Sequence, residues 1–212
     1  MRSMASSRGN IAAIVGVGPN LGLSIARKFA HEGYTVAILA RDLGRLSEFA
    51  DEIAREEKAQ VFAIRIDCSD SRSVREAFEA VSSLGAFNCA QQVLPGMVER
   101  GKGTILFTGC SASLNGIAGY SELCCGKFAL RALSQCLAKE FQPQGVHIAH
   151  IIIDGLIGPP NRCRGPSAAT TTSRGGGEGV MDPDALAQTY WHLHVQDRNA
   201  WTQEIDVRSS NC

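Results

Sequence analysis

A tyrosine and a lysine stand close together in the stretch YSELCCGK, residues 120–127. A lysine ammonium beside a tyrosine favours the phenolate and lowers the pKa of the phenol, so that the tyrosine can give a proton to a carbonyl oxygen. Four residues along a helix separate two such side chains by about 6 Å, but Lys127 follows Tyr120 by seven residues, or about 10 Å. Two interpretations of Tyr120 stay open: a proton donor, or an aromatic residue packed before a helix.

A glycine-rich stretch, VGVGPNLGLS at residues 15–24, lies between an apolar run and a helical pattern. In such a turn Gly16 permits a tight bend, Gly18 lets the backbone approach a pyrophosphate, and Gly22 allows close packing of the helix. The helix N-terminus then offers N–H groups to the phosphate oxygens. Asparagine tolerates left-handed geometry, which suits Asn20. An ordinary strand-to-helix turn is the alternative. The expected dinucleotide-binding residues are Gly16, Gly18, Asn20, Leu21 and Gly22.

Two charged residues end the next two predicted strands. Arg41 follows the strand predicted at residues 35–40, at the point of a doubly wound sheet that faces the adenosine ribose. A guanidinium there suits a 2′-phosphate and favours NADP over NAD; a solvated surface arginine is the alternative. Asp67 ends the strand predicted at residues 61–67, where it could contact the adenine edge or cap the next helix.

Short apolar runs alternate with helical patterns along the chain. This order predicts an α/β fold, a doubly wound, Rossmann-like parallel sheet with helices on both faces, in a single domain over residues 1–212. Residues 161–180 are rich in Gly, Ser and Thr and are expected to form a flexible loop. The predicted strands are 11–15, 35–40, 61–67, 104–109, 147–153 and 204–208, and the later predicted helices are 86–97, 126–141 and 182–195.

The chain resembles the short-chain dehydrogenase/reductase family over nearly its full length. The resemblance implies a nicotinamide dinucleotide cofactor and hydride transfer to or from a carbonyl or alcohol carbon of a small molecule. It also implies a site of serine, tyrosine and lysine with Tyr-x-x-x-Lys spacing. The segments that carry it are VGVGPNLG (15–22), AR (40–41), IDCSD (66–70), ILFTGCSAS (105–113), GKFALRALSQCLAKEF (126–141), IDGLI (153–157) and TQEIDVR (202–208).

The family lysine corresponds to Lys127, because GKFALRAL continues in register after it. The resemblance implies that this lysine binds the nicotinamide ribose and lowers the pKa of the tyrosine. The tyrosine position, four residues earlier, holds Leu123. Tyr120 is therefore the candidate proton donor, one helical turn away from the family position.

The serine position of the family corresponds to Cys110. A thiol is a weak hydrogen-bond donor, so the neighbours Ser111 and Ser113 are candidates to replace the family serine. A nucleophilic role for Cys110 is a further interpretation. The resemblance also implies that the backbone of Ile157 contacts the nicotinamide carboxamide.

One family strand is missing from the pattern. A helix ends near Ser83, and residues 86–97 read as another helix, with no strand between them. The resemblance places the fourth strand at this point, so the chain is expected to lack it. The first and fifth strands then pair directly or leave unpaired backbone groups, each of which costs about 1–3 kcal/mol.

The charge is balanced, with 21 basic and 21 acidic residues, which indicates no nucleic-acid surface. No apolar run has the length of a membrane span, and the first ten residues lack the apolar core of a secretory signal, so a cytoplasmic protein is expected. Three functions stay open: an NADP-dependent oxidoreductase, which the resemblance implies could form a homo-oligomer; a non-catalytic dinucleotide-binding or dimerising protein; or an inactive truncated variant.

Overall fold

The computed structural model describes residues 10–66, 78–160 and 180–209. These residues form two compact units. The first contains residues 10–66, 157–160 and 181–191, and the second contains 78–156, 180 and 192–209. No helix in the described ranges is both long and apolar enough to cross a membrane.

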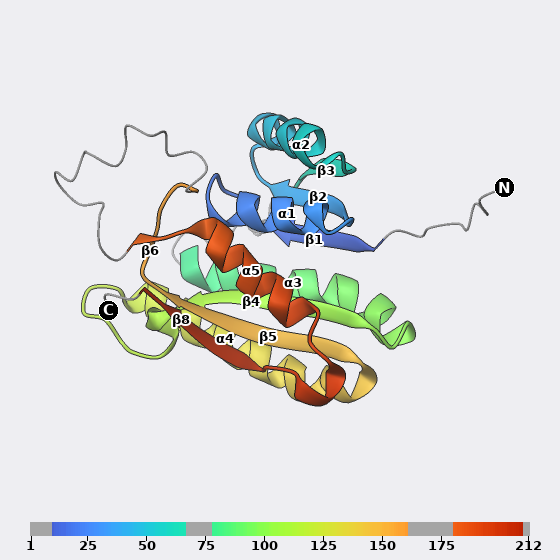
Figure 1. The fold of residues 1–212 in the computed structure, drawn as a ribbon. Helices are drawn as coiled ribbons and strands as arrows, with labels where there is room; N and C mark the ends of the chain where they lie inside the picture. The colour runs from blue at the N-terminus through green and yellow to red at the C-terminus, as the bar shows by residue number, and fades with distance from the viewer. Residues whose placement is uncertain (1–9, 67–77, 161–179, 210–212) are drawn as a thin grey trace. The chain divides into compact units, whose positions relative to one another are not determined.

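The first unit is built on a parallel sheet in the order β1-β2-β3 (Figure 1). Its strands are β1 (Ile11–Val15), β2 (Thr35–Ala40) and β3 (Val61–Arg65), connected by helices α1 (Leu21–His31) and α2 (Leu43–Glu57). Successive right-handed crossovers in one direction put both helices on one face of the sheet. Val36 and Ile38 of the central strand are fully buried. In the described ranges β1 pairs with β2 only.

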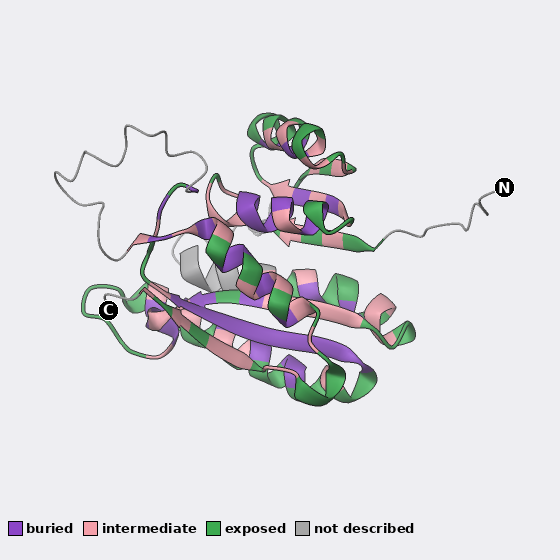
Figure 2. Cartoon of the chain, in the orientation of Figure 1, coloured by how far each residue is buried: buried purple, intermediate pink, exposed green. Residues whose placement is uncertain are grey.

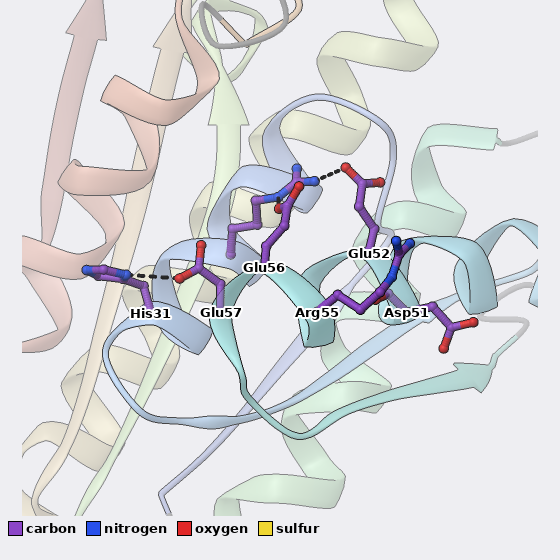
Figure 3. A network of polar contacts seen from close by, with 7 residues as sticks. His31, Asp51, Glu52, Arg55, Glu56 and Glu57 are labelled. Carbon is purple, nitrogen blue, oxygen red and sulfur yellow. Dashed lines mark hydrogen bonds and ion pairs between the residues drawn. The ribbon is translucent and has the colours of Figure 1, made fainter.

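A buried arginine links the two helices of this unit. Arg27 of α1 is 6% exposed, and its guanidinium binds Glu52 and Glu56 of α2. Beside it, Nδ1 of His31 lies 3.0 Å from Oε2 of Glu57, as Figure 3 shows. A buried charge is costly unless it is paired, so this network fixes how α2 packs on α1.

The second unit is built on a parallel sheet in the order β4-β5-β8. Its strands are β4 (Gly103–Cys110), β5 (Val146–Asp154) and β8 (Glu204–Arg208), and its main helices are α3 (Phe78–Glu99) and α4 (Ser121–Phe141). The central strand β5 is buried along almost its whole length, as Figure 2 shows. The core combines apolar residues of α3, α4, β4 and β5: Ala90, Leu94, Phe107, Leu130, Leu137, Ala138, Val146 and Ile148.

Helix α3 corrects a prediction. Two helices are expected on either side of residues 84–85, the second over residues 86–97, but one helix runs from Phe78 to Glu99. Leu94 is buried, and Met97 packs against the same core cluster after the proline. These tertiary contacts outweigh the local cost of Pro95, which removes one helical hydrogen bond. Residues 84–85, the point at which the resemblance places the family's fourth strand, are helical.

The remaining elements of the described ranges are two short strands, one α-helix and three 3₁₀ helices, which span Ser111–Ser113, Gln142–Gln144 and Arg198–Ala200. β6 (Leu156–Ile157) pairs with β7 (Val180–Met181), and α5 spans Pro183–His194. The α/β class and the parallel strand pairing are confirmed. The assignment of residues 1–212 to a single domain stays a prediction, and residues 161–179 of the expected flexible loop lie outside the described ranges.

Candidate functional site

The glycine turn after β1 bends at Gly16, as the sequence predicted. Gly16 has a φ of +80°, a conformation that favours glycine, and its N–H donates to the carbonyl of Leu39 over 2.8 Å. A Cβ on Gly16 or Gly18 would meet nothing within 4 Å, so open space faces the turn at both positions. A Cβ on Gly22 would stand 2.9 Å from Cα of Val17. Gly22 thus allows α1 to pack closely on the turn.

The start of α1 suits an anionic ligand. The helix begins at Leu21, and its first turn contains no acidic residue. Helix N-termini attract phosphate through free N–H groups and the helix dipole. Asn20 precedes the helix with φ −103° and ψ −103°, so it does not use left-handed geometry; Gly16 is the left-handed residue of the turn. The side-chain amide of Asn20 donates through Nδ2 to the carbonyl of Ile157 over 3.4 Å.

Arg41 is exposed directly after β2. The next residue, Asp42, caps α2, because its Oδ1 accepts a hydrogen bond from N of Arg45 over 3.2 Å. The guanidinium of Arg41 is therefore exposed after β2, and the carboxylate of its neighbour Asp42 is used in the cap of α2. Asp67, which was predicted to contact the adenine edge or to cap the next helix, lies outside the described residues.

Lys127 and Tyr120 lie at different levels of α4. The helix begins at Ser121, five residues earlier than predicted, and Tyr120 is its N-cap residue. The carbonyl of Tyr120 accepts from N of Cys124 over 2.9 Å, and 58% of the residue is exposed. Lys127 is half-buried further along the helix, and so is Leu123 at the family's tyrosine position. Because the helix continues from Tyr120 to Lys127, the two residues stay about 10 Å apart along its axis.

Burial and hydrogen bonding at the end of β4 distinguish the candidates for the role of the family serine. Cys110 ends the strand and is half-buried, and a short 3₁₀ turn follows over Ser111–Ser113. Ser113 is fully buried, and its hydroxyl donates to the carbonyl of Cys110 over 2.7 Å. Ser113 therefore stabilises the turn and is unsuited to hold a substrate. Ser111, half-buried, is the better candidate to replace the family serine.

Three charged or polar residues of the second unit were missed by the sequence analysis. His150 of β5 is 1% exposed and lies next to Glu204, which also binds Arg131. The pKa of Glu204 is lowered mainly by the hydrogen bond from Arg131. A histidine inside the apolar run HIAHIII was the signal that could have pointed to this cluster.

The expected cofactor-binding and catalytic residues divide between the units. The glycine turn, Arg41 and Ile157 belong to the first unit, and Cys110, Ser111, Tyr120 and Lys127 belong to the second. The residues of the first unit fit a dinucleotide phosphate, because the turn has open space, a helix N-terminus and no nearby acidic side chain in the first helical turn.

Comparison with protein families gives a match in two segments. A family described as short chain dehydrogenase matches residues 10–84 and residues 80–158. The two segments meet at residues 80–84, inside helix α3. This is the point where the sequence lacked an expected strand.

Among curated relatives, 17-beta-hydroxysteroid dehydrogenase type 1 of Homo sapiens is 28% identical over 181 residues, which cover 66% of this chain and 55% of that protein. The chain spans 24% and 55% of the lengths of two curated relatives that it matches. Among solved structures, a short-chain dehydrogenase from Rhodopseudomonas palustris has a TM-score of 0.75 and 26% identity, covering 95% of this chain and 99% of that one. L-sorbose reductase from Gluconobacter frateurii, complexed with NADPH and L-sorbose, has a TM-score of 0.76 and 21% identity, with 96% of each chain covered.

Proposed function

The chain belongs to the short-chain dehydrogenase family, and on this premise we propose that it is an NADP-dependent oxidoreductase acting on a carbonyl or alcohol group of a small molecule. The observation that carries the proposal is the turn at Gly16–Gly22, whose open space and helix N-terminus suit a pyrophosphate. The structural neighbour complexed with NADPH supports the same cofactor class.

NADP is proposed over NAD because of Arg41. Its exposed guanidinium follows β2, where a 2′-phosphate would offer two or three oxygens to its planar set of donors. The neighbouring Asp42 is engaged as the cap of α2, so its carboxylate has a structural role already. In the proposed complex Ile157 contributes its backbone to the carboxamide, and Asn20 keeps that segment beside the glycine turn.

The bound cofactor supplies or accepts the hydride. Reduction of a carbonyl also requires a proton at its oxygen, and this chain must provide it. We assign Lys127 to the ribose of the nicotinamide nucleotide and Tyr120 to the proton, with Ser111 as the hydroxyl that holds the substrate oxygen. Tyr120 is exposed at a helix N-cap and receives less help from Lys127 than a tyrosine four residues away would. We therefore expect slow turnover.

A second candidate function is dinucleotide binding without catalysis. Leu123 stands at the family's tyrosine position, and Cys110 stands at its serine position. A leucine has no proton to give, and a thiol donates only weakly. The two-segment family match, which meets inside the continuous helix α3, supports the related proposal that the chain is a shortened variant lacking the fourth strand.

The deciding experiment is a titration of the purified protein with NADPH and with NADH, which follows cofactor fluorescence and the thermal midpoint together. Tight NADPH binding with a raised midpoint, followed by turnover in a screen of carbonyl substrates that is lost in Lys127→Ala, supports the oxidoreductase. Binding without turnover supports the second candidate. Absence of binding together with a broad melt would contradict both and leave the inactive shortened variant.

We also propose that the chain forms a homo-oligomer through α3 and α4. Phe87 and Val93 of α3 and Phe128 of α4 are exposed apolar side chains, at 38%, 39% and 42%. An apolar side chain that is exposed in a single chain can bury its surface against a second copy. Sedimentation velocity of the wild type and of Phe128→Glu tests this: the variant is expected to sediment as a monomer, and an unchanged oligomer would exclude α4 from the interface.

A further inference from the structure

Side chains from three elements meet inside the second unit. Glu204, the first residue of β8, accepts two hydrogen bonds from Arg131 of α4, one at each carboxylate oxygen and both 2.7 Å long. Oε2 of Glu204 also lies 3.0 Å from Nδ1 of His150, whose residue is 1% exposed on β5. A bidentate arginine–carboxylate pair holds its two side chains in a fixed geometry. The cluster therefore fixes α4 and β8 against the central strand.

The imidazole of His150 carries its proton on Nδ1, because the partner there is a carboxylate, which accepts. Its Nε2 is buried and has no hydrogen-bond partner. Burial lowers the pKa of His150 below its ordinary value; Glu204 opposes this effect, and the charges of Arg131 and Lys127 add to it. The ring is therefore neutral at physiological pH.

The Nε2 edge of the ring lies against β4 at Gly109. A Cβ on Gly109 would stand 2.7 Å from Cε1 of His150 and closer still to Nε2, so the ring fills the space that a side chain would occupy. Protein interiors are close-packed, so a side chain at position 109 and the ring of His150 could not both fit. Gly109 directly precedes Cys110 and Ser111, so the ring sets the path of the strand end that presents them.

Lys127, the lysine of the proposed site, lies on the same helix as Arg131 of the cluster. It precedes Arg131 by one turn of α4, so both side chains leave the same face of the helix. The charged groups that act on His150 are Lys127 and Arg131 from α4 and Glu204 from β8, while β4 presents the uncharged Gly109. A second proton on the ring would find no acceptor at Nε2 and would repel both cations.

We propose that His150 is a positioning residue, which holds Lys127 and the Cys110–Ser111 strand end in place as long as its ring is neutral. This inference rests on the proposed function, since it concerns the lysine assigned to the cofactor. His150 touches neither cofactor nor substrate. When the pH falls, protonation of the ring displaces Lys127 and weakens cofactor binding.

The first test compares wild type with His150→Asn, which keeps an N–H donor near Nδ1 but cannot titrate. Calorimetric titration with NADP⁺ at several values between about pH 8 and about pH 5.5 brackets the ordinary histidine range. Wild type is expected to lose affinity toward low pH by about fivefold more than the variant does. His150→Leu, which lacks the donor, is expected to bind weakly at every pH. An identical pH dependence in wild type and His150→Asn overturns the inference.

A second set of measurements needs no cofactor. ¹⁵N spectra of the His150 imidazole are expected to show the Nδ1–H tautomer. The ¹³C signal of methylated Lys127 is assigned by its loss in Lys127→Arg. In wild type this signal is expected to shift as His150 titrates, and in His150→Asn it is expected not to shift in this way. The inference is overturned if the spectra show an Nε2–H tautomer, or if the Lys127 signal does not shift as His150 titrates. If wild type binds no NADP⁺ at any pH, the proposed function fails, and these spectra alone decide whether His150 positions Lys127.

Discussion

The amide of Asn20 donates a hydrogen bond to the carbonyl of Ile157 over 3.4 Å, although 137 residues separate the two in the chain. A side chain of the glycine turn therefore contacts the backbone of the segment that follows β5. Both ends of this bond belong to the proposed cofactor site.

Removal of this bond should weaken cofactor binding. Asn20→Ala loses a hydrogen bond to a partly buried carbonyl, which is worth about 1 kcal/mol, or about fivefold in affinity for NADPH. Asn20→Asp should lose more, because it places a carboxylate beside both the carbonyl and the phosphates. Titrations by cofactor fluorescence measure the change, with the exposed Asn115→Ala as the control. Unchanged affinity in both Asn20 variants would remove this residue from the site.

Substitution of Gly22 should destabilise the first unit. A Cβ at this position meets the backbone of Val17 at 2.9 Å, and backbone cannot move aside as a flexible side chain can. We expect Gly22→Ala to lower the free energy of unfolding by about 1–3 kcal/mol in urea denaturation. The matched control is Gly44→Ala in α2, where the nearest atom is a side-chain oxygen at 3.5 Å. Equal stability of the two variants would mean that α1 is not packed on the turn as described.

The buried arginine should matter more than its exposed neighbour. Arg27→Met leaves Glu52 and Glu56 without their shared partner, and hydrogen bonds to charged groups contribute about 1.5–3 kcal/mol. Because both carboxylates are partly exposed and can be hydrated, we expect a loss near the lower end of this range. Arg55→Met, on the exposed side of α2 (Figure 3), is the control and should change stability by less than about 0.5 kcal/mol. Similar losses in both variants would show that burial of Arg27 is unimportant.

Arg41 should decide between the two nicotinamide dinucleotides. A charged hydrogen bond to a phosphate contributes about 1.5–3 kcal/mol, so Arg41→Ala should weaken NADPH binding by roughly tenfold to a hundredfold. NADH has no 2′-phosphate, so its affinity should stay unchanged. Parallel titrations with both cofactors measure this, and Arg55→Ala is a control for general loss of charge in the same unit. A parallel drop for both cofactors would assign Arg41 a structural role instead.

Stability should fall in weakly acidic solution. Burial is the main cause of the lowered pKa values of His147, His150 and His194. Each accepts a proton more readily in the unfolded chain, so below about pH 6.5 the unfolded state binds more protons and the folded state loses stability. Each steepens this loss by at most about 1.4 kcal/mol per pH unit. Below the ordinary carboxyl range the lowered pKa of Glu204 adds a further loss as that group becomes protonated.

Urea denaturation of the wild type between about pH 8 and about pH 5 measures this loss. His150→Asn should flatten the curve between neutral pH and pH 5, since one of the three titrating groups is gone. A wild-type midpoint that is independent of pH would mean that these three histidines accept protons as easily in the folded state as in the unfolded chain.

Local patterns in the sequence predicted most elements of the fold. The ranges 11–15, 35–40 and 204–208 coincide with β1, β2 and β8, because short segments with β-branched residues between turn residues favour a strand. The Gly16 turn and the Asp42 cap were also predictable, since each depends on residues within a few positions of one another. The family resemblance, carried by such local segments, is confirmed by the two-segment match.

Tertiary structure decided the rest, because the interactions concerned join distant residues. Helix α3 continues through residues 84–85 and past Pro95 because Leu94 and Met97 pack into a core made by other elements. Arg131 and Glu204 are 73 residues apart, and Glu204 and His150 are 54 apart, so no local spacing could bring them to one cluster. A buried charge or imidazole is stable only where the fold places a hydrogen-bonding partner beside it. Here the pairing of β5 with β8 places Glu204 beside His150.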